Sequence, residues 1–213
     1  MEKALLVVDV IKGFAEKGFD KNMYCENTEK IKPKLIELIE YMRSQNIPVI
    51  YCCDSHEKND PELKENSGPW DDHCMKGSKS SEIVDWLPTE GIRNVKKSDF
   101  DMDSFAEFGE FMRIDKRTYS SFFDTPLDDL LKEKGIKEVY IAGLVTSICV
   151  QHTAAGAFFN GYKISIADEC CADINEEKHK TALEYMKNNY SAGTVRIRRD
   201  GAVVYKSRLE KAL

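Results

Sequence analysis

Runs of apolar residues predict two buried strands with an amphipathic helix between them near the start of the chain. The run Ala4–Val10 carries a charge only at Asp9, as is typical of a strand covered on both faces of a parallel sheet. Over Asn27–Ser44 the apolar residues fall at helical spacing, and Pro48 then leads into a second apolar run, Val49–Cys53. The apolar positions of the helix are Ile31, Leu35, Leu38, Ile39 and Met42.

The alternation of strands and helices continues in the second half of the chain. The pattern predicts a helix around Leu127–Lys134 that stops at Gly135, and then a buried strand at Val139–Gly143. Next come a helix from about 147 to 159, a strand at Lys163–Ala167 and a helix that opens near Asn175. Because the two element types alternate, the sequence predicts a three-layer α/β/α fold, with a mostly parallel sheet and helices on both faces.

Residues able to carry chemistry gather at the predicted carboxyl ends of three strands. Asp9 closes the first strand, and Asp54 follows the second. The turn Gly143–Cys149 follows the strand predicted at Val139–Gly143. Ligands of open α/β sheets bind beyond the carboxyl ends of the strands, so we expect an active site along this edge. The polar stretch Asp54–Lys79 is too long for a routine connection, and we expect it to be functional or disordered.

The composition narrows the classes of partner. The 213 residues are 42% hydrophobic and 10% aromatic, which fits one domain over 1–213 with a loop insertion at about 54–79. The net charge of -6 is spread without a basic stripe, so neither nucleic acid nor a membrane surface is an expected partner. No apolar stretch approaches the roughly 18 residues that span a bilayer. The expected partners are therefore small molecules and further copies of the chain.

Cysteine usage indicates a reducing compartment. The chain opens Met1-Glu2-Lys3-Ala4, without the basic and apolar regions of a secretory signal. It has seven cysteines, an odd number, and two pairs are adjacent: Cys52-Cys53 and Cys170-Cys171. We therefore expect free thiols and a cytoplasmic location.

Cys149 is the cysteine best placed for catalysis. It follows a strand, a glycine and a short turn, near the start of a helix, where unpaired backbone N–H groups and the helix dipole favour an anion. This position should stabilise a thiolate and the oxyanion that forms when the sulfur attacks a carbonyl. The alternative is a small buried hydrophobe, which is how free cysteines mostly behave and how we interpret the other six.

The loop after the second strand contains a potential metal site. It begins Asp54-Ser-His56 and closes with Trp70-Asp-Asp-His73-Cys-Met-Lys-Gly77. One carboxylate and two imidazoles suit a divalent ion and leave positions for water or substrate. Spacing alone leaves open that both histidines are ordinary exposed residues.

The chain resembles the isochorismatase-like cysteine hydrolases over nearly its whole length. The likeness lies in Asp9 at the end of a strand, in Lys116-Arg-Thr-Tyr-Ser-Ser-Phe, and in Gly143-Leu-Val-Thr-Ser-Ile-Cys149-Val. The resemblance implies the fold of that family, with Cys149 as nucleophile, Asp9 as general base and Lys116 as the cation that holds both in place. It also implies self-association into a homo-oligomer.

The same resemblance implies a special turn before the nucleophile. A cis peptide would join Val145 to Thr146, and the backbone N–H groups of Val145 and Cys149 would form the oxyanion hole.

The metal loop resembles that of the nicotinamidase branch, which has Asp-x-His followed by Trp-x-x-His-Cys-x-x-Gly. The likeness implies a divalent ion, Zn²⁺, Fe²⁺ or Mn²⁺, on Asp54, His56 and His73. Glu62 is the candidate for a further carboxylate ligand, with Glu65 close behind. The implied reaction is hydrolysis of nicotinamide to nicotinic acid and ammonia through a thioester on the cysteine.

Three aromatic residues near these segments are candidates to sandwich a flat substrate ring, although core packing would explain them equally well. They are Phe14, Trp70 and Tyr119.

Three positions depart from the pattern of relatives and leave the substrate open. Ile11 stands where many carry a polar residue, Gly13 where many carry an acid, and Ser147 where nicotinamidases usually have Asp. One alternative is another small-amide hydrolase of the superfamily, acting on a carbamoyl or ureido group. A second is a binding protein that keeps the fold without catalysis.

Overall fold

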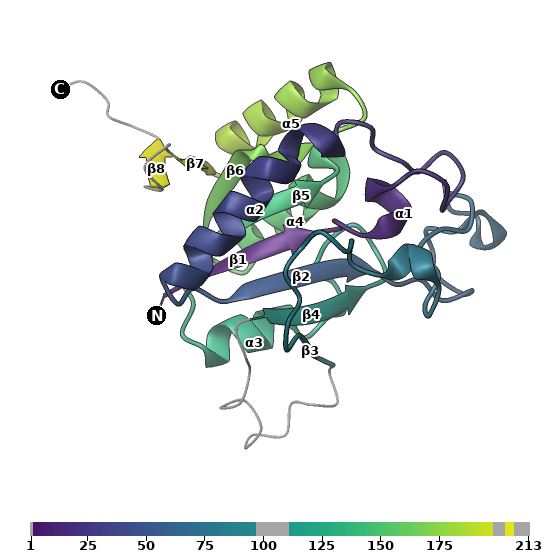
Figure 1. Cartoon of the computed structure of the whole chain (residues 1–213), viewed down its shortest axis with the longest axis horizontal. Helices are drawn as coiled ribbons and strands as arrows, with labels where there is room; N and C mark the ends of the chain where they lie inside the picture. The colour runs from purple at the N-terminus through teal and green to yellow at the C-terminus, as the bar shows by residue number, and fades with distance from the viewer. Residues whose placement is uncertain (1, 97–110, 198–202, 207–213) are drawn as a thin grey trace.

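An eight-stranded sheet forms the centre of the computed structural model, which describes residues 2–96, 111–197 and 203–206 (Figure 1). The strand order is β3-β4-β2-β1-β5-β6-β7-β8. Each neighbouring pair is parallel except β7 and β8, which run antiparallel at one edge. The strands are β1 (Lys3–Val8), β2 (Val49–Asp54), β3 (Arg93–Asn94), β4 (Phe111–Lys116), β5 (Glu138–Leu144), β6 (Lys163–Ala172), β7 (Gly193–Ile197) and β8 (Val203–Lys206).

Helices cover both faces of this sheet, which confirms the predicted three-layer α/β/α fold. On one face lie α1 (Lys12–Ala15) and the long α2 (Thr28–Ser44). The other face packs against α3 (Leu127–Glu133), α4 (Gln151–Phe159) and α5 (Glu176–Asn189). Within the described residues, no helix combines the length and the apolar character that crossing a lipid bilayer requires.

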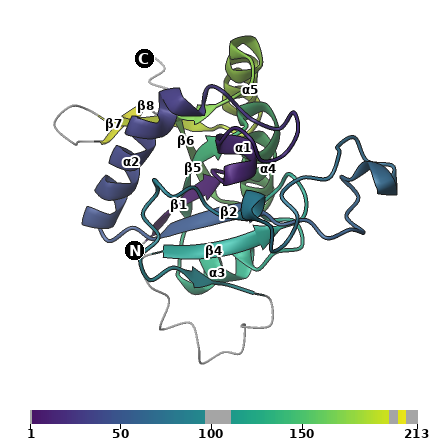
Figure 2. The same ribbon diagram turned by 45° about the vertical axis from the view of Figure 1, so that its right-hand side comes forward.

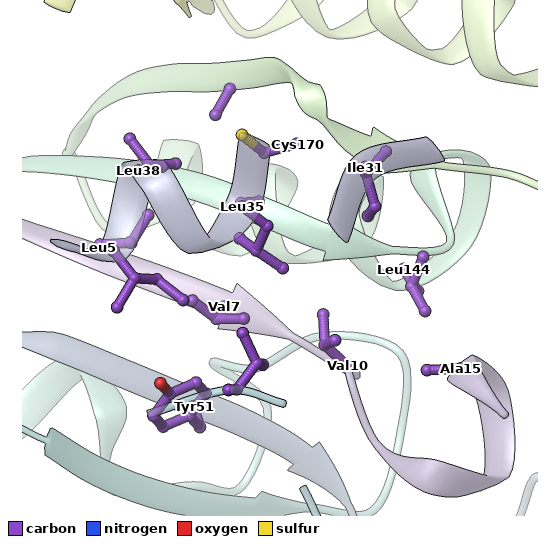
Figure 3. Packing of buried hydrophobic residues seen from close by; sticks show 14 of the residues in the cluster. Leu5, Val7, Val10, Ala15, Ile31, Leu35, Leu38, Tyr51, Leu144 and Cys170 are labelled. Carbon is purple, nitrogen blue, oxygen red and sulfur yellow. The ribbon is translucent and has the colours of Figure 1, made fainter. Parts of the chain in front are cut away.

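The apolar stripe of α2 holds this helix on the sheet. Its residues Ile31, Leu35 and Leu38 are buried against Leu5 and Val7 of β1 (Figure 3). The alternate residues of β1 face the opposite core, where α3 and α4 lie. Burial on both faces explains why this strand is a continuous apolar run in the sequence.

β1 ends at Val8, earlier than the predicted Val10, because the backbone turns at Asp9. The Asp9 φ angle is 53°, in the left-handed region that side chains other than glycine rarely adopt. Its N–H donates to the Cys52 carbonyl at 2.8 Å, so the turn is anchored to the neighbouring strand. Unusual backbone conformations of this kind persist where surrounding contacts impose them, and they cluster at functional sites.

Gly143 allows β5 to approach β1 closely at the same edge. Its φ angle is 119°, and a Cβ atom built there would lie 2.0 Å from the Val8 carbonyl oxygen. No side chain fits in that space, so only glycine satisfies both the dihedral angle and the contact.

β4 was not predicted, although it carries a candidate site residue at its end. Arg113 and Asp115 lie on the less buried side of this strand and pair with each other at 2.7 Å. Their charges obscure the alternation that Met112 and Ile114 follow in the core. The register with β2 places Lys116 directly beside Asp54.

Other elements differ from prediction in length. β6 continues to Ala172 instead of ending at Ala167, and the helix expected from 147 begins with a π-helical turn, Thr146–Val150, before α4. The short elements α1, β3, β7 and β8 had no counterpart in the predicted pattern.

The long loop after β2 is structured. A parallel bridge joins His56 to Met75 and another joins Leu63 to Trp70, with a 3₁₀ turn at Lys64–Asn66 between the two halves. A second 3₁₀ turn, Lys79–Ser81, follows the loop. Figure 2 shows the loop reaching out beyond the carboxyl ends of β2 and β4. Its two ends thus lie at the edge where the sequence predicts the site.

Candidate active site

A buried lysine and two buried carboxylates form the centre of the site. Lys116 is fully buried at the end of β4, and its Nζ lies 2.7 Å from Asp9 Oδ2. The same ammonium donates to Asp54 Oδ1 and, at 3.1 Å, to the Thr118 carbonyl. Asp9 Oδ1 accepts the Asp54 backbone N–H at 2.8 Å. Charges this deeply buried are tolerated because each has an opposite charge or a hydrogen-bond partner.

Cys149 joins this cluster from the turn after β5. Its side chain is 6% exposed, and Sγ and carboxylate oxygens of Asp9 and Asp54 all lie within 4.8 Å of one another. The Asp9 carboxylate is close enough to the thiol to act on its pKa. The structure therefore brings Asp9, Lys116 and Cys149 into one pocket, although they are far apart in sequence.

The electrostatics of the cluster keep Lys116 charged and move the pKa of Asp9 towards neutral pH. Burial and the neighbouring Asp54 carboxylate raise the pKa of Asp9 to about 6, against the opposing effect of Lys116. Burial would lower the pKa of Lys116, but the Asp54 and Asp9 carboxylates outweigh it and keep the pKa above its ordinary value. Lys116 therefore remains charged, whereas Asp9 has a pKa suited to taking and returning a proton near neutral pH.

The expectation of a stabilised thiolate at Cys149 was wrong for the resting site. Burial raises the pKa of this thiol well above its ordinary value, and the two carboxylates add to the effect while Lys116 opposes it. Helix N–H groups do not outweigh the loss of water around the sulfur. The direction of this pKa shift favours a protonated thiol at Cys149 in the resting site.

The expectation of a cis peptide between Val145 and Thr146 was also wrong. All peptide bonds of the described residues are trans. Val145 is extended, with φ -88° and ψ 149°, and the chain then enters the π-helical turn, where the Val150 N–H donates to the Val145 carbonyl at 3.3 Å. The turn is formed by this wider hydrogen-bonded ring instead of by a cis bond.

Asp173 ties this turn to the loop that follows β6. One carboxylate oxygen accepts the Ser147 N–H at 2.7 Å and the other accepts the Ile174 N–H at 2.9 Å. Next to it, Thr146 Oγ1 and His179 Nδ1 are 2.8 Å apart. The turn that carries Cys149 is therefore held from two directions by residues of another segment.

We expect Asp173→Asn to lower kcat for amide hydrolysis about tenfold, because weakening one charged hydrogen bond lets the turn move out of register. Steady-state ammonia release measures the effect. The matched control is Asp168→Asn, since Asp168 pairs with Arg196 at 2.6 Å outside this turn and should leave kcat within about twofold of wild type. Equal losses in the two variants would contradict a role for Asp173 in holding the turn.

A second cluster adjoins the first and has the composition of a metal site. Ligand atoms of Asp54, His56 and His73 lie within 4.8 Å of one another, and all three residues are buried. His56 Nε2 lies 3.7 Å from Asp54 Oδ2 and 3.9 Å from Glu62 Oε2. Asp54 belongs to both clusters, since its other oxygen, Oδ1, accepts a hydrogen bond from Lys116 Nζ.

The residues present fit a divalent ion. His73 Nδ1 is 2.8 Å from the Asp71 carbonyl, so Nδ1 carries the hydrogen and Nε2 keeps its lone pair. His56 Nε2 and Glu62 Oε1 are buried and have no hydrogen-bond partner among the described residues. Buried polar atoms without partners are rare, and two imidazoles and a carboxylate are the ligands that Zn²⁺, Fe²⁺ and Mn²⁺ accept.

Of the two candidate carboxylates in the loop, only Glu62 borders this cluster. Burial and Asp54 raise the pKa of Glu62 to about 7, against the opposing effects of Lys116 and His56. Glu65 lies in the 3₁₀ turn and is exposed.

Both clusters open onto one cavity with a largely apolar lining and an empty volume of about 560 Å³. Cys149, Asp54, Glu62 and His73 reach its wall. The three aromatic residues expected near the substrate also line it, as do four residues that the sequence did not single out. The aromatic residues are Phe14, Trp70 and Tyr119, and the other four are Asn22, Met23, Ile148 and Ile174. Val145, at the turn before Cys149, lines the cavity as well.

Trp70 and Tyr119 form one side of the cavity together. The Trp70 indole N–H donates to the Tyr119 hydroxyl at 2.9 Å, which links the metal loop to the segment after β4. His152 of α4 packs against Tyr119, with ring centroids 5.2 Å apart. Phe14 packs beside the Asp54–His56–His73 cluster, with its ring centroid 5.7 Å from that of His73.

Sequence comparison assigns this chain to a family. The model of the isochorismatase domain matches residues 3–108 and 102–197. The chain belongs to the isochorismatase family. Among curated relatives, it is 30% identical to the uncharacterized isochorismatase family protein YaaI of Bacillus subtilis, over 88% of this chain and 90% of the relative. It is 26% identical to the nicotinamidase of Escherichia coli, over 91% and 93% of the two chains.

A solved structure agrees with this assignment. The pyrazinamidase of Pyrococcus horikoshii, determined in complex with zinc, matches this isochorismatase-family chain with a TM-score of 0.75 and 28% identity. The match covers 92% of this chain and all of that one. The fold is therefore that of the isochorismatase-like hydrolases, as the three sequence segments implied.

The three departures from the family pattern have structural explanations. Ile11 is fully buried and forms a bridge with Ile83, so an apolar side chain suits it. At Gly13, the space a side chain would need is filled by Asp20, whose Oδ2 accepts the Cys74 N–H at 2.8 Å. Asp20 thus supplies a carboxylate near the position where many relatives carry an acid. At Ser147, the carboxylate of Asp173 reaches the turn instead.

Some residues of the site could not be predicted because their contribution depends on contacts between distant segments. Asp173 and Asp20 lie in loops outside every motif, and each acts through a hydrogen bond to a backbone N–H far along the chain. The cavity residue Ile174 follows a strand that was predicted too short. Only its neighbour Asn175, which caps α5 by accepting the Glu177 N–H, was recognised as a helix start.

Proposed function

We propose that the protein is a metal-dependent nicotinamidase, which hydrolyses nicotinamide to nicotinic acid and ammonia through a thioester on Cys149. The observation that carries the proposal is that the Cys149–Asp9–Lys116 cluster and the Asp54–His56–His73 cluster open onto the same aromatic-lined cavity. A nucleophile with its base stands at one end, and a site able to orient a heteroaromatic ring stands beside it. The similarity to the E. coli nicotinamidase and to the zinc-bound pyrazinamidase supports the same substrate class.

The first half of the reaction would form the thioester. Cys149 Sγ attacks the carboxamide carbon while its proton passes to Asp9 Oδ2, which pairs with Lys116 but accepts no directed hydrogen bond from the described residues. The carbonyl oxygen becomes an oxyanion facing the backbone N–H groups of Val145 and Cys149. The proton on Asp9 then moves to the amide nitrogen, the C–N bond breaks, and ammonia leaves.

The second half would release the acid. A water molecule gives a proton to Asp9 as its oxygen attacks the thioester carbon, and the C–S bond then breaks. The sulfur recovers the proton, which leaves nicotinic acid and a thiol at Cys149. Lys116 keeps its charge throughout and offsets the negative charge that builds up near Asp9.

Asp54, His56 and His73, with Glu62 beside them, would hold the divalent ion. When bound, the ion would supply a Lewis-acidic anchor for the pyridine nitrogen or for water around it. Phe14, Trp70 and Tyr119 would bind the faces of the ring. Fixing the ring in this way can remove several kcal/mol from the barrier to attack.

Ammonia release from nicotinamide tests the proposal, compared with a panel of carbamoyl and ureido amines. We expect a kcat/KM for nicotinamide at least ~100-fold above the panel, because the aromatic lining would bind a flat ring. Removing divalent ions with a chelator should lower the rate at least ~10-fold, and one of Zn²⁺, Fe²⁺ or Mn²⁺ should restore it.

Faster turnover of a carbamoyl amine would show the substrate to be wrong and leave the hydrolase standing. Turnover of no amide, with nicotinamide still bound, would favour a binding protein on this fold.

The proposed setting is the cytoplasm. All seven cysteines are free thiols in the structure, as a reducing compartment would maintain them. The proposed small-molecule partner is nicotinamide, and the proposed assembly is a homo-oligomer.

A further inference from the structure

Asp60 is a fully buried carboxylate in the metal loop that belongs to neither cluster. Its side chain has no exposed surface, and both oxygens are engaged. Oδ1 accepts a hydrogen bond from Arg117 Nε and forms an ion pair with Arg117 Nη2. Oδ2 accepts the Glu57 N–H at 2.9 Å and lies 3.0 Å from His56 Nδ1. A carboxylate held by this many donors has one orientation only.

The contact with Asp60 determines which nitrogen of His56 faces the metal cluster. An ionised carboxylate only accepts hydrogen bonds, so in the neutral ring the His56 hydrogen lies on Nδ1 and the lone pair on Nε2. Nε2 is the buried atom that has no partner among the described residues, and it points toward Asp54 and Glu62. The ring is therefore already in the tautomer and orientation that a metal ligand requires.

Arg117 connects this arrangement to the catalytic cluster. It directly follows Lys116 at the end of β4, and the two cations serve different carboxylates: Lys116 pairs with Asp9 and Asp54, Arg117 with Asp60. The Arg117 side chain is 43% exposed, so it can be replaced without leaving a cavity in the core. One strand end thereby sets the position of both halves of the site.

Asp60 also shapes the loop through its backbone, which any test must separate from its side chain. Its carbonyl accepts the Asn66 side-chain N–H at 2.8 Å and the Leu63 N–H at 3.2 Å. Substitution by asparagine keeps these backbone contacts and the volume of the side chain. It removes the charge and offers His56 either a carbonyl or an amide group.

We propose that Asp60, clamped by Arg117, is a positioning residue that fixes the His56 ring with Nε2 directed at the metal. The inference deepens the proposed function and rests on its metal site. Carboxylate partners of metal-binding histidines usually contribute 10- to 100-fold in affinity, because they fix the tautomer and raise the basicity of the ligand.

The test is a titration of the metal-free protein with Zn²⁺ in competition with a chromophoric chelator. We expect Asp60→Asn to bind Zn²⁺ about 10- to 100-fold more weakly than wild type, and Arg117→Gln about 3- to 10-fold more weakly. The matched control is Glu57→Gln, which removes a carboxylate from the same loop. Glu57 pairs with Lys76 at the surface and its side chain is 44% exposed. The affinity of Glu57→Gln for Zn²⁺ should therefore equal that of wild type.

A second readout follows the tautomer itself. Long-range ¹H–¹⁵N spectra of the metal-free protein, recorded at a pH where the His56 ring is neutral, should show His56 as the pure Nδ1–H tautomer in wild type and Glu57→Gln, and as a mixture in Asp60→Asn. A role confined to loop folding would lower the melting temperature without changing the tautomer.

The outcomes separate this inference from the proposed function. Wild-type affinity and an unchanged tautomer in Asp60→Asn would overturn the role of Asp60 and leave the metal site intact. If wild type binds Zn²⁺ no more tightly than His56→Ala, the metal site fails and the inference with it. Should Asp60→Asn not fold, Arg117→Gln decides, because wild-type affinity there would overturn the clamp.

Discussion

Replacing Cys149 by serine is expected to lower kcat for amide hydrolysis at least ~10⁴-fold while the fold and the binding of the substrate remain. A hydroxyl is a much weaker acid than a thiol, so transfer of its proton to Asp9, with a pKa of about 6, is far less favourable. The change is nearly isosteric in a site that is 6% exposed, so the free energy of unfolding should change little. Ammonia release gives the rate, and calorimetric titration with nicotinamide gives the affinity.

Cys171→Ser is the matched control for this variant. Cys171 is also buried, in the same core cluster, and its Sγ lies 3.8 Å from the Ile141 carbonyl, a contact that a hydroxyl can keep. The activity of Cys171→Ser should stay within about threefold of wild type. Comparable losses in both variants would mean that Cys149 contributes packing and not chemistry, and the thioester route would have to be abandoned.

Replacing Lys116 by methionine is expected to lower the free energy of unfolding by about 3–5 kcal/mol and to abolish most activity. Methionine fills a similar volume, so the loss comes from leaving Asp9 and Asp54 buried without their cation. Denaturant unfolding of the metal-free protein at neutral pH measures it. The double variant Asp9→Asn with Lys116→Met should recover part of the stability, because it removes one of the two charges left without a partner.

Lys12→Met is the control for charge removal as such. Lys12 pairs with Glu82 and Asp85, both at 2.9 Å, but the two carboxylates are 55% and 84% exposed. Water compensates for a lost partner at such a site, so the expected loss is at most about 1 kcal/mol. A Lys116→Met variant no less stable than Lys12→Met would show that the buried cluster does not depend on its lysine.

The sequence was most informative where burial is uniform. β1, β2 and β5 are covered on both faces, and their continuous apolar runs predict them within a few residues. β4 has Asp115 exposed, so its pattern is mixed and it was missed. Lys116 was nevertheless predicted as a site residue, because the resemblance to a family indicated it where the hydrophobic periodicity did not.

Contacts between distant segments account for most of what prediction missed. Nothing near Asp60 in sequence indicates that Arg117 will bind it, since the two meet only when β4 lies beside β2. The acidity of Cys149 was misjudged for a related reason. The helix start was visible in the sequence, but the extent of burial, which raises the pKa of the thiol, depends on the whole fold.

The tight contact between Gly143 and the Val8 carbonyl bears on how the pocket can be redesigned. Mutagenesis aimed at a new substrate can vary the aromatic wall and the turn around Ser147, since neither sets the spacing between β1 and β5. Position 143 admits no such variation, whatever amide is chosen. Libraries that fix this glycine and randomise the aromatic wall and the turn around Ser147 would therefore sample specificity without including chains that cannot close the sheet.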